Sequence, residues 1–276
     1  MTAGLPPLRE VIARHDLGAD KAFGQHFLLD LNITRKIARV AAAGPGDVVI
    51  EVGPGPGGLT RALLETGAAV IAIERDRRFT PALDDLKAAF PGALTIVEAD
   101  ALAVDERALL NGATAKIVAN LPYNISTELL VKWLAANHEA APLWSQMTLM
   151  FQKEVADRIL AAPGSKTYGR LSVIAQAASR PSRAFDLPAR AFTPPPKVQS
   201  SVVAFAPAPA RVETLARLEK VTQAAFSQRR KMLRSSLKPV FGAEVEARLA
   251  AAGVAATRRA EEIAVADFLT LAGLSD

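Results

Sequence analysis

Residues 47–60 read DVVIEVGPGPGGLT, and this stretch decides the fold of the chain. A short apolar, β-branched run is formed by Val48, Val49, Ile50 and Val52, and this composition is typical of a buried parallel strand. Four glycines follow within six residues, at Gly53, Gly55, Gly57 and Gly58. Residues 59–64 repeat apolar side chains at helical spacing, and Gly67 ends them. The pattern predicts a strand, a tight glycine turn, and a helix whose free N–H groups face the turn.

Three of these glycines, Gly53, Gly55 and Gly58, match the spacing G-x-G-x-x-G, which by itself indicates little. A dinucleotide site, an S-adenosylmethionine (SAM) site and a purely structural turn all fit this spacing. Pro54 and Pro56 remove two backbone N–H donors from the loop. Because a pyrophosphate is held mainly by such donors, the loop is a poor cradle for one.

An acidic residue, Glu74, ends the next apolar run and lies 21 residues after Gly53. A carboxylate at this place can accept hydrogen bonds from both ribose hydroxyls of an adenosine. NAD and SAM both contain that ribose, so Glu74 indicates a nucleoside without identifying it. The alternative is a solvated acid at the end of a strand.

Apolar strands alternate with helices between residues 47 and 161. The predicted strands are residues 48–52, 69–74, 94–99, 116–119 and 146–151. The predicted helices are residues 32–43, 59–64, 79–89, 106–110, 127–137 and 153–161. This alternation predicts an α/β fold with a doubly wound parallel sheet. Ligands of such sheets bind beyond the carboxyl ends of the strands, so Glu51–Gly58, Glu74, Asp100 and Asn120 should share one rim.

The remaining segments extend this sheet and add a second domain. Residues 5–17 predict a short helix, and residues 21–29 an ordered loop. The pattern then predicts a helix at 168–179, an edge strand at 184–187 and a last strand at 198–205. A hairpin at this edge of the sheet would return Phe192 to the rim. A linker at 207–210 precedes predicted helices at 212–226, 229–237, 243–252 and 263–271. We therefore predict a domain at 1–209, with an N-terminal helical extension at 1–45, and a small all-helical domain at 210–276.

Composition excludes several classes of site. The chain has 276 residues, half of them hydrophobic, and no cysteine, so it has no disulfide or thiolate metal site. Its three histidines, His15, His26 and His138, are far apart, so we expect no zinc or iron site. No apolar run reaches the ~20 residues of a membrane span, and the N-terminus lacks a signal sequence. We expect a cytoplasmic monomer that does not contact membranes.

Positive charge gathers in the last third of the chain. Residues 1–179 carry 18 Lys and Arg against 19 Asp and Glu, whereas residues 180–276 carry 15 against 9. The strongest cluster is Arg229, Arg230, Lys231 and Arg234, where a helix would place Arg230 and Arg234 on one face. Such an array suits the phosphates of a polyanion, which position RNA without reading its sequence. A merely solvated basic surface is the alternative.

The tetrapeptide Asn120-Leu121-Pro122-Tyr123 follows the fourth predicted strand. The side-chain oxygen of Asn120 and the backbone carbonyl of Leu121 could accept both hydrogens of one exocyclic amino group. Tyr123 could stack on the ring that carries this group. An aromatic amine is a weak nucleophile because its lone pair is delocalised, and two such acceptors would localise the pair and aim it at an electrophilic methyl group. A turn with a helix-capping Asn is the alternative.

Taken together, the motifs resemble the KsgA-type (RsmA) ribosomal RNA adenine dimethyltransferases. They are EVGPGPGGLT, Glu74, Asp100, NLPY, FTPPPKVQSSV and FSQRRKMLRSSL, in this order over nearly the whole chain. The resemblance implies a SAM-dependent enzyme with a seven-stranded Rossmann-like sheet. It implies dimethylation of N6 on two adjacent adenines near the 3′ end of 16S rRNA in the 30S subunit, releasing S-adenosylhomocysteine without a metal.

The resemblance also implies residue roles. Gly53 would line the methionine part of SAM, Glu74 would hold the ribose, and Asp100 would meet the adenine. Leu28 and His26 would complete the cofactor site, although His26 stands where the family motif has Asn. Asn120 would bridge cofactor and target amine within the catalytic group Asn120, Leu121, Pro122 and Tyr123. Tyr123 and Phe192 would sandwich the target base, which must leave its stack.

Other functions fit part of the pattern. An Erm-type enzyme would methylate 23S rRNA and confer macrolide resistance, and the helical tail argues mildly against it. A binding or assembly factor could keep the fold without catalysis, but the intact tetrapeptide Asn120–Tyr123 argues against this. An NAD oxidoreductase would leave that tetrapeptide unexplained. No phosphate-binding lysine follows the glycine loop, which argues against an NTPase.

Overall fold

The computed structural model describes residues 4–19, 25–139, 141–208, 212, 215–228 and 230–274. Of the predicted segments, residues 21–24 of the loop, residues 209–210 of the linker and Arg229 of the basic cluster lie outside these ranges. None of the helices in the described ranges has the length and apolar content needed to cross a membrane.

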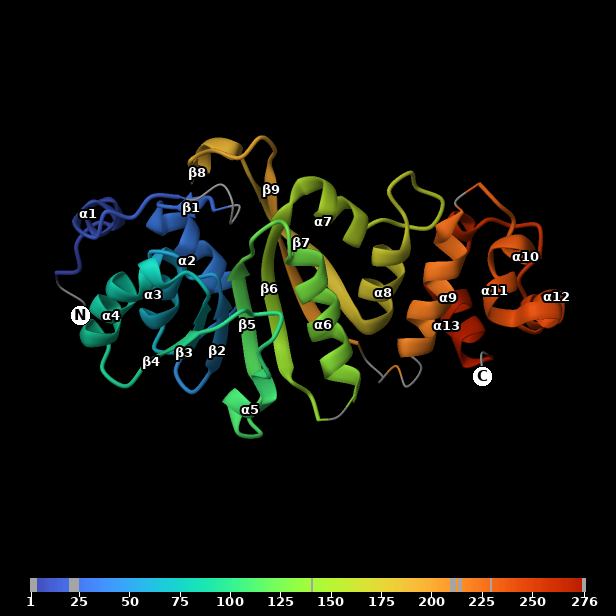
Figure 1. The fold of residues 1–276 in the computed structure, drawn as a ribbon, viewed down its shortest axis with the longest axis horizontal. Helices are drawn as coiled ribbons and strands as arrows, with labels where there is room; N and C mark the ends of the chain where they lie inside the picture. Colours follow the sequence, from blue (N-terminus) through green and yellow to red (C-terminus); the bar gives the residue numbers. More distant parts are fainter. Residues whose placement is uncertain are drawn as a thin grey trace. The chain divides into compact units, whose positions relative to one another are not determined.

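A seven-stranded sheet forms the centre of the fold, with the strand order β4-β3-β2-β5-β6-β9-β7 (Figure 1). Its strands are β2 (Val48–Val52), β3 (Ala69–Glu74), β4 (Leu94–Glu98), β5 (Ala115–Asn120), β6 (Trp144–Gln152), β7 (Ser179–Leu187) and β9 (Ser200–Pro207). Neighbouring strands from β4 to β6 run parallel, and β9 pairs with β6 in the antiparallel sense. The predicted doubly wound α/β fold is confirmed.

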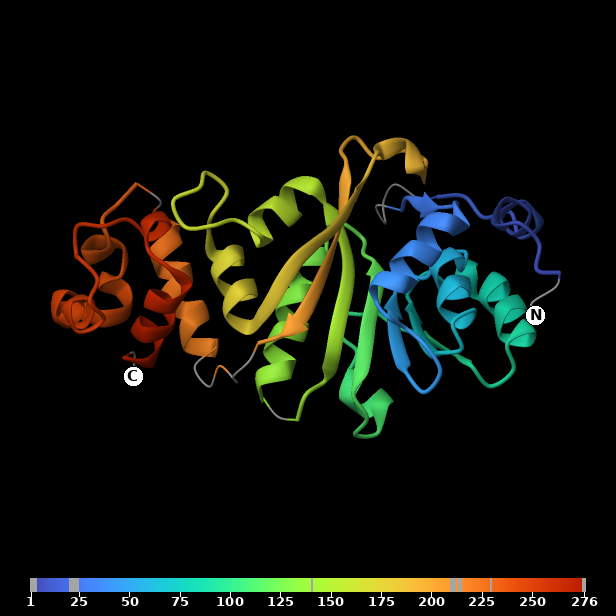
Figure 2. The ribbon, with the colours of Figure 1, turned by 180° about the vertical axis from the view of Figure 1, so that it is seen from behind.

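Helices cover both faces of this sheet. They include α2 (Leu31–Val40), α3 (Gly58–Leu64), α4 (Thr80–Ala89), α5 (Glu106–Leu110) and the first part of α6 (Ser126–Glu139). The helix α1 (Leu8–Arg14) precedes them in the chain, and α7 (Lys153–Ile159) follows β6. In Figure 1 α6 lies in front of the sheet, and in Figure 2 α2 lies in front of it. The central strands are therefore buried on both sides, as their continuous apolar runs require.

The loop between β2 and α3 needs its glycines. Gly53, Gly55 and Gly57 all have positive φ, at 69°, 54° and 86°, where side chains are strained. A Cβ on Gly57 would lie 2.5 Å from Leu86, and one on Gly58 would lie 2.9 Å from the Leu28 carbonyl oxygen. The loop is thus built by backbone conformation and close packing together, which leaves bare backbone at the carboxyl end of β2.

Packing divides the chain into two compact units. The first comprises Met1–Trp133, Pro142–Lys153 and Ser182–Phe205, and the second Leu134–Ala141, Glu154–Pro181 and Ala206–Asp276. In the second unit α9 (Leu215–Ser227) packs on α8 (Arg170–Ala178) and α13 (Val265–Gly273), with α10 (Leu233–Ser236), α11 (Lys238–Phe241) and α12 (Val245–Ala251) beyond. These units follow spatial contacts and are discontinuous in sequence. Separate domains at 1–209 and 210–276 stay a prediction about independent folding.

Two local predictions are wrong. Residues 229–237 were expected to form one helix, but α10 begins only at Leu233. The N–H groups of Leu233 and Arg234 bond the carbonyls of Arg258 and Ala256, and Met232 forms a β-bridge with Arg259, so this stretch pairs with a distant segment and Arg230 and Lys231 lie in a turn. Arg230 and Arg234 consequently do not share a helical face.

The expected loop at residues 21–29 instead contains a short strand in its described part. This strand, β1 (Phe27–Leu28), pairs antiparallel with β8 (Phe192–Thr193). The pairing joins segments about 165 residues apart, so no local pattern could reveal it.

Candidate active site

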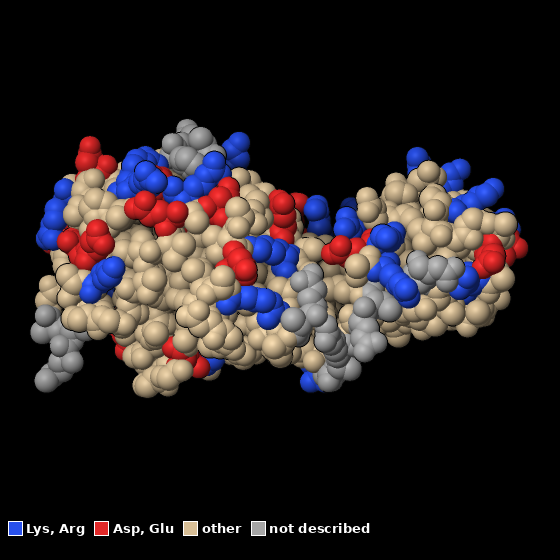
Figure 3. Space-filling model, turned by 60° about the horizontal axis from the view of Figure 1, so that its bottom comes forward, with Lys and Arg blue, Asp and Glu red and all other residues tan. Residues whose placement is uncertain are grey.

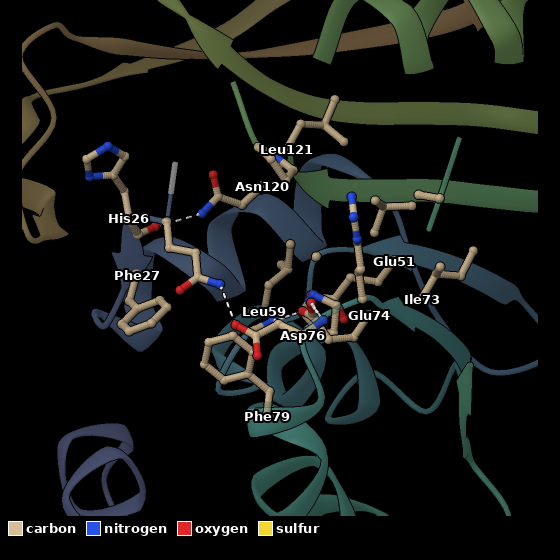
Figure 4. A pocket seen from close by; sticks show the side chains of 18 of the residues that line it. His26, Phe27, Glu51, Leu59, Ile73, Glu74, Asp76, Phe79, Asn120 and Leu121 are labelled. Atoms are coloured by element: carbon tan, nitrogen blue, oxygen red, sulfur yellow. Dashed lines mark hydrogen bonds between the residues drawn. The ribbon is translucent and has the colours of Figure 1, made fainter. Parts of the chain in front are cut away.

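A pocket lies at the carboxyl ends of β2, β3, β4 and β5, all within the first unit (Figure 4). The predicted residues that line it are His26, Leu28, Glu51, Gly53, Glu74, Asp100, Asn120, Leu121, Pro122 and Tyr123. Residues from before β2 and from α1 complete the wall, among them Leu8, Gln25 and Phe27. The structure thus brings together side chains that are spread over one hundred residues of sequence, because parallel strands end at the same edge.

Glu74 braces the glycine loop. Its Oε2 accepts a hydrogen bond from the N–H of Gly55 at 3.1 Å, and its Oε1 accepts one from the N–H of Asp76 at 2.8 Å. The side chain is 9% exposed, and burial raises its pKa although these backbone donors oppose the increase. A carboxylate oxygen can accept more than one hydrogen bond, so Glu74 keeps acceptor capacity toward the pocket.

Asp100 is held in a turn just after β4. Its Oδ1 accepts the N–H of Leu102 at 3.0 Å, and its Oδ2 lies 3.1 Å from the guanidinium of Arg75. Both side chains of this ion pair are well exposed, so the pair itself is weak. The turn, more than the ion pair, fixes where the Asp100 carboxylate meets the pocket.

Glu51 is a pocket residue whose importance the sequence prediction missed. It is 1% exposed, and no hydrogen bond reaches its Oε2 from any residue in the described ranges. Burial raises the pKa of Glu51 to about 8, and the neighbouring Thr60 opposes this increase. The only sequence signal was a carboxylate inside the apolar run VVIEV. A buried orphan acceptor beside a pocket is suited to a ligand that brings its own N–H or O–H donor.

Gln25 and Asp76 form a second polar pair that the sequence prediction missed. Nε2 of Gln25 donates to Oδ2 of Asp76 at 3.0 Å, and the Arg78 guanidinium binds the same carboxylate. These hydrogen bonds hold the pKa of Asp76 below its usual value. The pair ties the segment before β1 to the segment after β3, and both residues line the pocket.

Asn120 ends β5, and the nitrogen of its side-chain amide already makes a hydrogen bond. Its Nδ2 donates to the backbone carbonyl of His26 at 3.3 Å (Figure 4). Because a carbonyl only accepts, the amide nitrogen must face His26, and this fixes the opposite position of Oδ1. That oxygen has no hydrogen-bond partner within the part of the chain that the structure describes. It is therefore available to a donor in the pocket.

Tyr123 is fixed from the outer side of the site. Its hydroxyl lies 2.7 Å from Oγ of Ser200, and burial raises its pKa. Its ring centroid lies 5.7 Å from that of His26, with the planes tilted by 31°. The ring is thus held at one edge and by its hydroxyl, in a position where a flat ligand could stack.

His26 and Phe192 differ from their expected arrangement. The imidazole of His26 points away from Glu74 and Asp76 in Figure 4, and its Nδ1 lies 2.7 Å from the carbonyl oxygen of Pro194. Phe192 pairs with Leu28, is 3% exposed and belongs to the apolar core, and it does not line the pocket. The structure therefore does not place Phe192 opposite Tyr123. The roles of His26 in cofactor binding and of Phe192 in stacking stay predictions.

The basic cluster lies in the second unit. Arg230, Lys231 and Arg234 are all exposed, on the turn that precedes α10 and on α10 itself. On the face drawn in Figure 3, Lys and Arg side chains lie on both units with acidic side chains among them. Within the described ranges no group of His, Asp and Glu is arranged to hold a metal ion.

Comparisons with known proteins identify the family to which the chain is similar. A family model described as ribosomal RNA adenine dimethylase matches residues 18–275. A protein of Phenylobacterium zucineum named ribosomal RNA small subunit methyltransferase A is 62% identical over 270 residues, which cover 97% of this chain and 92% of that protein. A dimethyladenosine transferase from Plasmodium falciparum has a similar structure, with a TM-score of 0.74, 26% identity and coverage of 89% and 96% of the two chains. The 23S rRNA methyltransferase ErmE is also similar, with a TM-score of 0.67, 26% identity and coverage of 90% and 98%.

Proposed function

The chain belongs to the ribosomal RNA adenine dimethylase family, and on that premise we propose that it dimethylates N6 of two adjacent adenosines near the 3′ end of 16S rRNA. The substrate would be the 30S subunit, so the enzyme would act in the cytoplasm during small-subunit biogenesis. Each transfer forms an N6–CH₃ bond, breaks the S–CH₃ bond of SAM, and releases S-adenosylhomocysteine and the N6 proton. We further propose that the protein acts as a monomer.

The pocket residues suit the parts of SAM. Bare backbone at Gly53 and the orphan Oε2 of Glu51 suit the methionine part, which carries N–H donors. Glu74 retains acceptor capacity for ribose hydroxyls, and Asp100 lies where it can accept from an adenine amino group. When bound, SAM supplies a methyl group made electrophilic by the adjacent sulfonium.

The chain would contribute position and acceptors to the reaction. Oδ1 of Asn120 and the carbonyl of Leu121 would accept the two N6 hydrogens, which localises the nitrogen lone pair toward the methyl group. Tyr123 would hold the flipped base by stacking. No base is required before attack, because the proton leaves only after the new bond has formed. The observation that carries this proposal is the unpartnered Oδ1 of Asn120 beside the pocket.

Mass spectrometry of 16S rRNA tests the proposal directly. Unmethylated 30S subunits incubated with the protein and SAM should gain four methyl groups on two adjacent adenosines near the 3′ end. Cofactor binding without methyl incorporation would instead favour a non-catalytic assembly factor. Methylation of 23S rRNA in place of 30S subunits would favour the Erm-type function, which the structural similarity to ErmE keeps as the second candidate.

The exposed basic cluster would bind rRNA phosphates. Arg230→Ala with Arg234→Ala should weaken binding to 30S subunits and reduce the slope of log affinity against log salt by about two, because each lost phosphate contact lowers it by about one. Binding would be measured across a salt series. A double variant of two exposed arginines in the first unit, Arg9→Ala with Arg39→Ala, is the control. An unchanged slope would show that the cluster is only a solvated surface.

A further inference from the structure

Lys132 lies on α6, about two turns after the segment that carries Asn120 and Tyr123. All three N–H donors of its ammonium group make hydrogen bonds. Nζ donates to the carbonyl oxygen of Ala101 at 2.9 Å and to that of Val104 at 2.6 Å. The third donor reaches Oε1 of Glu106 at 2.9 Å. An ammonium has three N–H donors, so one cation satisfies two loop carbonyls and one carboxylate.

The partner carboxylate is itself tightly held. Glu106 begins α5 and is 3% exposed, and its Oε1 also accepts the indole N–H of Trp133 at 2.7 Å. Trp133 is fully buried next to Lys132 in sequence, and its own carbonyl accepts the indole N–H of Trp144 at 2.8 Å. Consecutive residues of α6 thus bind the same carboxylate, and the cation cannot shift without breaking several hydrogen bonds.

The loop that Lys132 binds, residues 99–105, forms one wall of the pocket. Asp100, Ala101 and Leu102 line the pocket, and the loop's own hydrogen bonds are local, as from the N–H of Ala103 to the carbonyl of Asp100 at 2.9 Å. The ion pair of Asp100 with Arg75 is exposed and weak. The cation of Lys132 is therefore a strong anchor that ties this wall to α6.

We propose that Lys132 is a positioning residue for the cofactor: it fixes residues 99–105 so that Asp100 and Leu102 are preformed at the adenine end of the pocket. The inference rests on the proposed function, because it takes Asp100 as the contact of the adenine. It extends that function by assigning a role to a side chain that does not itself line the pocket. The same contacts link the adenine wall to the helix that follows the target-base segment.

Lys116 is a matched control, because its substitution separates an effect on the position of the pocket wall from an effect on the stability of the fold. Lys116 on β5 donates to the carbonyl of Ala42 at 2.5 Å and to Asp47 at 2.8 Å, so it too is a partly buried cation between a carbonyl and a carboxylate. It lies near the start of β5, at the opposite end of the strand from Asn120, and does not line the pocket. Lys116→Met should cost stability in a similar way without touching the adenine wall.

The test compares Lys132→Met with Lys116→Met. For Lys132→Met, the KM for SAM and the Kd for 5′-methylthioadenosine, which contains only the nucleoside end, should both rise about tenfold, while kcat on 30S subunits stays within about twofold. For Lys116→Met both constants should match wild type, even if the melting temperature falls as much. Equal KM values for Lys132→Met and wild type, or equal increases in both variants, would overturn the inference.

Two further measurements keep the result interpretable. If Lys132→Met does not fold, Lys132→Gln, which keeps two N–H donors, replaces it, and its KM for SAM must rise with kcat unchanged; an unchanged KM overturns the inference. If the wild-type protein methylates 30S subunits and the Lys132 variant has a normal KM for SAM, only the proposed role of Lys132 is refuted. Wild-type protein that neither binds 5′-methylthioadenosine nor methylates 30S subunits refutes the proposed function itself.

Discussion

The two sides of the pocket are built differently. On the side formed by β2 and β3, Glu74 and Asp76 already accept hydrogen bonds from backbone and side-chain donors. On the side formed by the end of β5, Oδ1 of Asn120 has no partner among the described residues, and Tyr123 contacts His26 through its ring and Ser200 through its hydroxyl. We call the first the cofactor side and the second the base side.

This difference suits two ligands with different demands. A cofactor that is used in every turnover benefits from a preformed surface, because ordering it again would cost binding free energy. A base that must be aimed needs acceptors that are fixed in place but still free to bind. Glu51 is an exception on the cofactor side, because its buried Oε2 has no hydrogen-bond partner among the described residues.

The largest expected effect concerns Glu51 and is measured as a change of stability with pH. The folded pKa of Glu51 is about 8, above the value of 4.5 for the exposed side chain, so the folded state keeps a proton that the unfolded state loses as pH rises. The free energy of unfolding should therefore fall between pH 5 and pH 8, by at most about 1.4 kcal/mol per pH unit. Glu51→Gln should remove this contribution and be the more stable protein at pH 8, up to about 4 kcal/mol.

Urea unfolding of both proteins at pH 5, 6.5 and 8 measures this difference. Glu74, whose pKa burial also raises, remains in the variant and leaves a smaller slope of the same sign. Glu98→Gln, at an exposed acid at the end of β4, is the control and should follow wild type. A stability difference that does not grow with pH would show that Glu51 is ionised in the folded protein and would contradict this prediction.

The next largest effect tests the base side. Asn120→Ala removes the free acceptor, so kcat for methylation of 30S subunits should fall about 10²–10³-fold, or about 3–4 kcal/mol, as for other groups that act mainly in the transition state. The Kd for S-adenosylhomocysteine should change far less. Asn32→Ala, at an exposed residue of α2, is the control. A large loss of cofactor affinity with unchanged kcat would assign Asn120 to the cofactor side and remove the contrast.

The sequence predicted the frame of the pocket well. The predicted strands at 48–52 and 69–74 and the helix at 106–110 coincide with β2, β3 and α5. These elements have strong local periodicity and clear glycine or acidic boundaries, which is the kind of information that a single sequence holds. The shared rim of Glu74, Asp100 and Asn120 then followed from the rule that parallel strands end at one edge.

What the sequence could not predict depends on distant partners. Phe192 is drawn into the core by pairing with Leu28, and the N–H groups of Leu233 and Arg234 bond the carbonyls of Arg258 and Ala256. The unpartnered state of Glu51 is likewise visible only when all its neighbours are in place. Such features are set by three-dimensional packing and have no local signature.

A smaller effect tests how far the cofactor side is preformed. Glu74→Gln places an amide between the N–H groups of Gly55 and Asp76, and one of these donors must lose its acceptor. We expect the free energy of unfolding to fall by about 1–2 kcal/mol and the Kd for SAM to rise about tenfold. Calorimetric titration measures the affinity, with Glu98→Gln again as the control. Lost stability with unchanged affinity would mean that Glu74 only braces the glycine loop.

The smallest effect concerns the anchor of the base side. Tyr123→Phe keeps the ring but removes the hydrogen bond to Ser200, which should cost about 0.5–1.5 kcal/mol of stability and leave cofactor affinity unchanged. Because the ring would then lose its anchor at Ser200 and keep its contact with His26, the KM for 30S subunits should rise a few-fold while kcat changes little. Ser200→Ala breaks the same bond from the other partner, so the two variants should agree and their double variant should add nothing further. A full additive effect in the double variant would show that the hydroxyl of Tyr123 acts on the substrate and does not merely hold the ring.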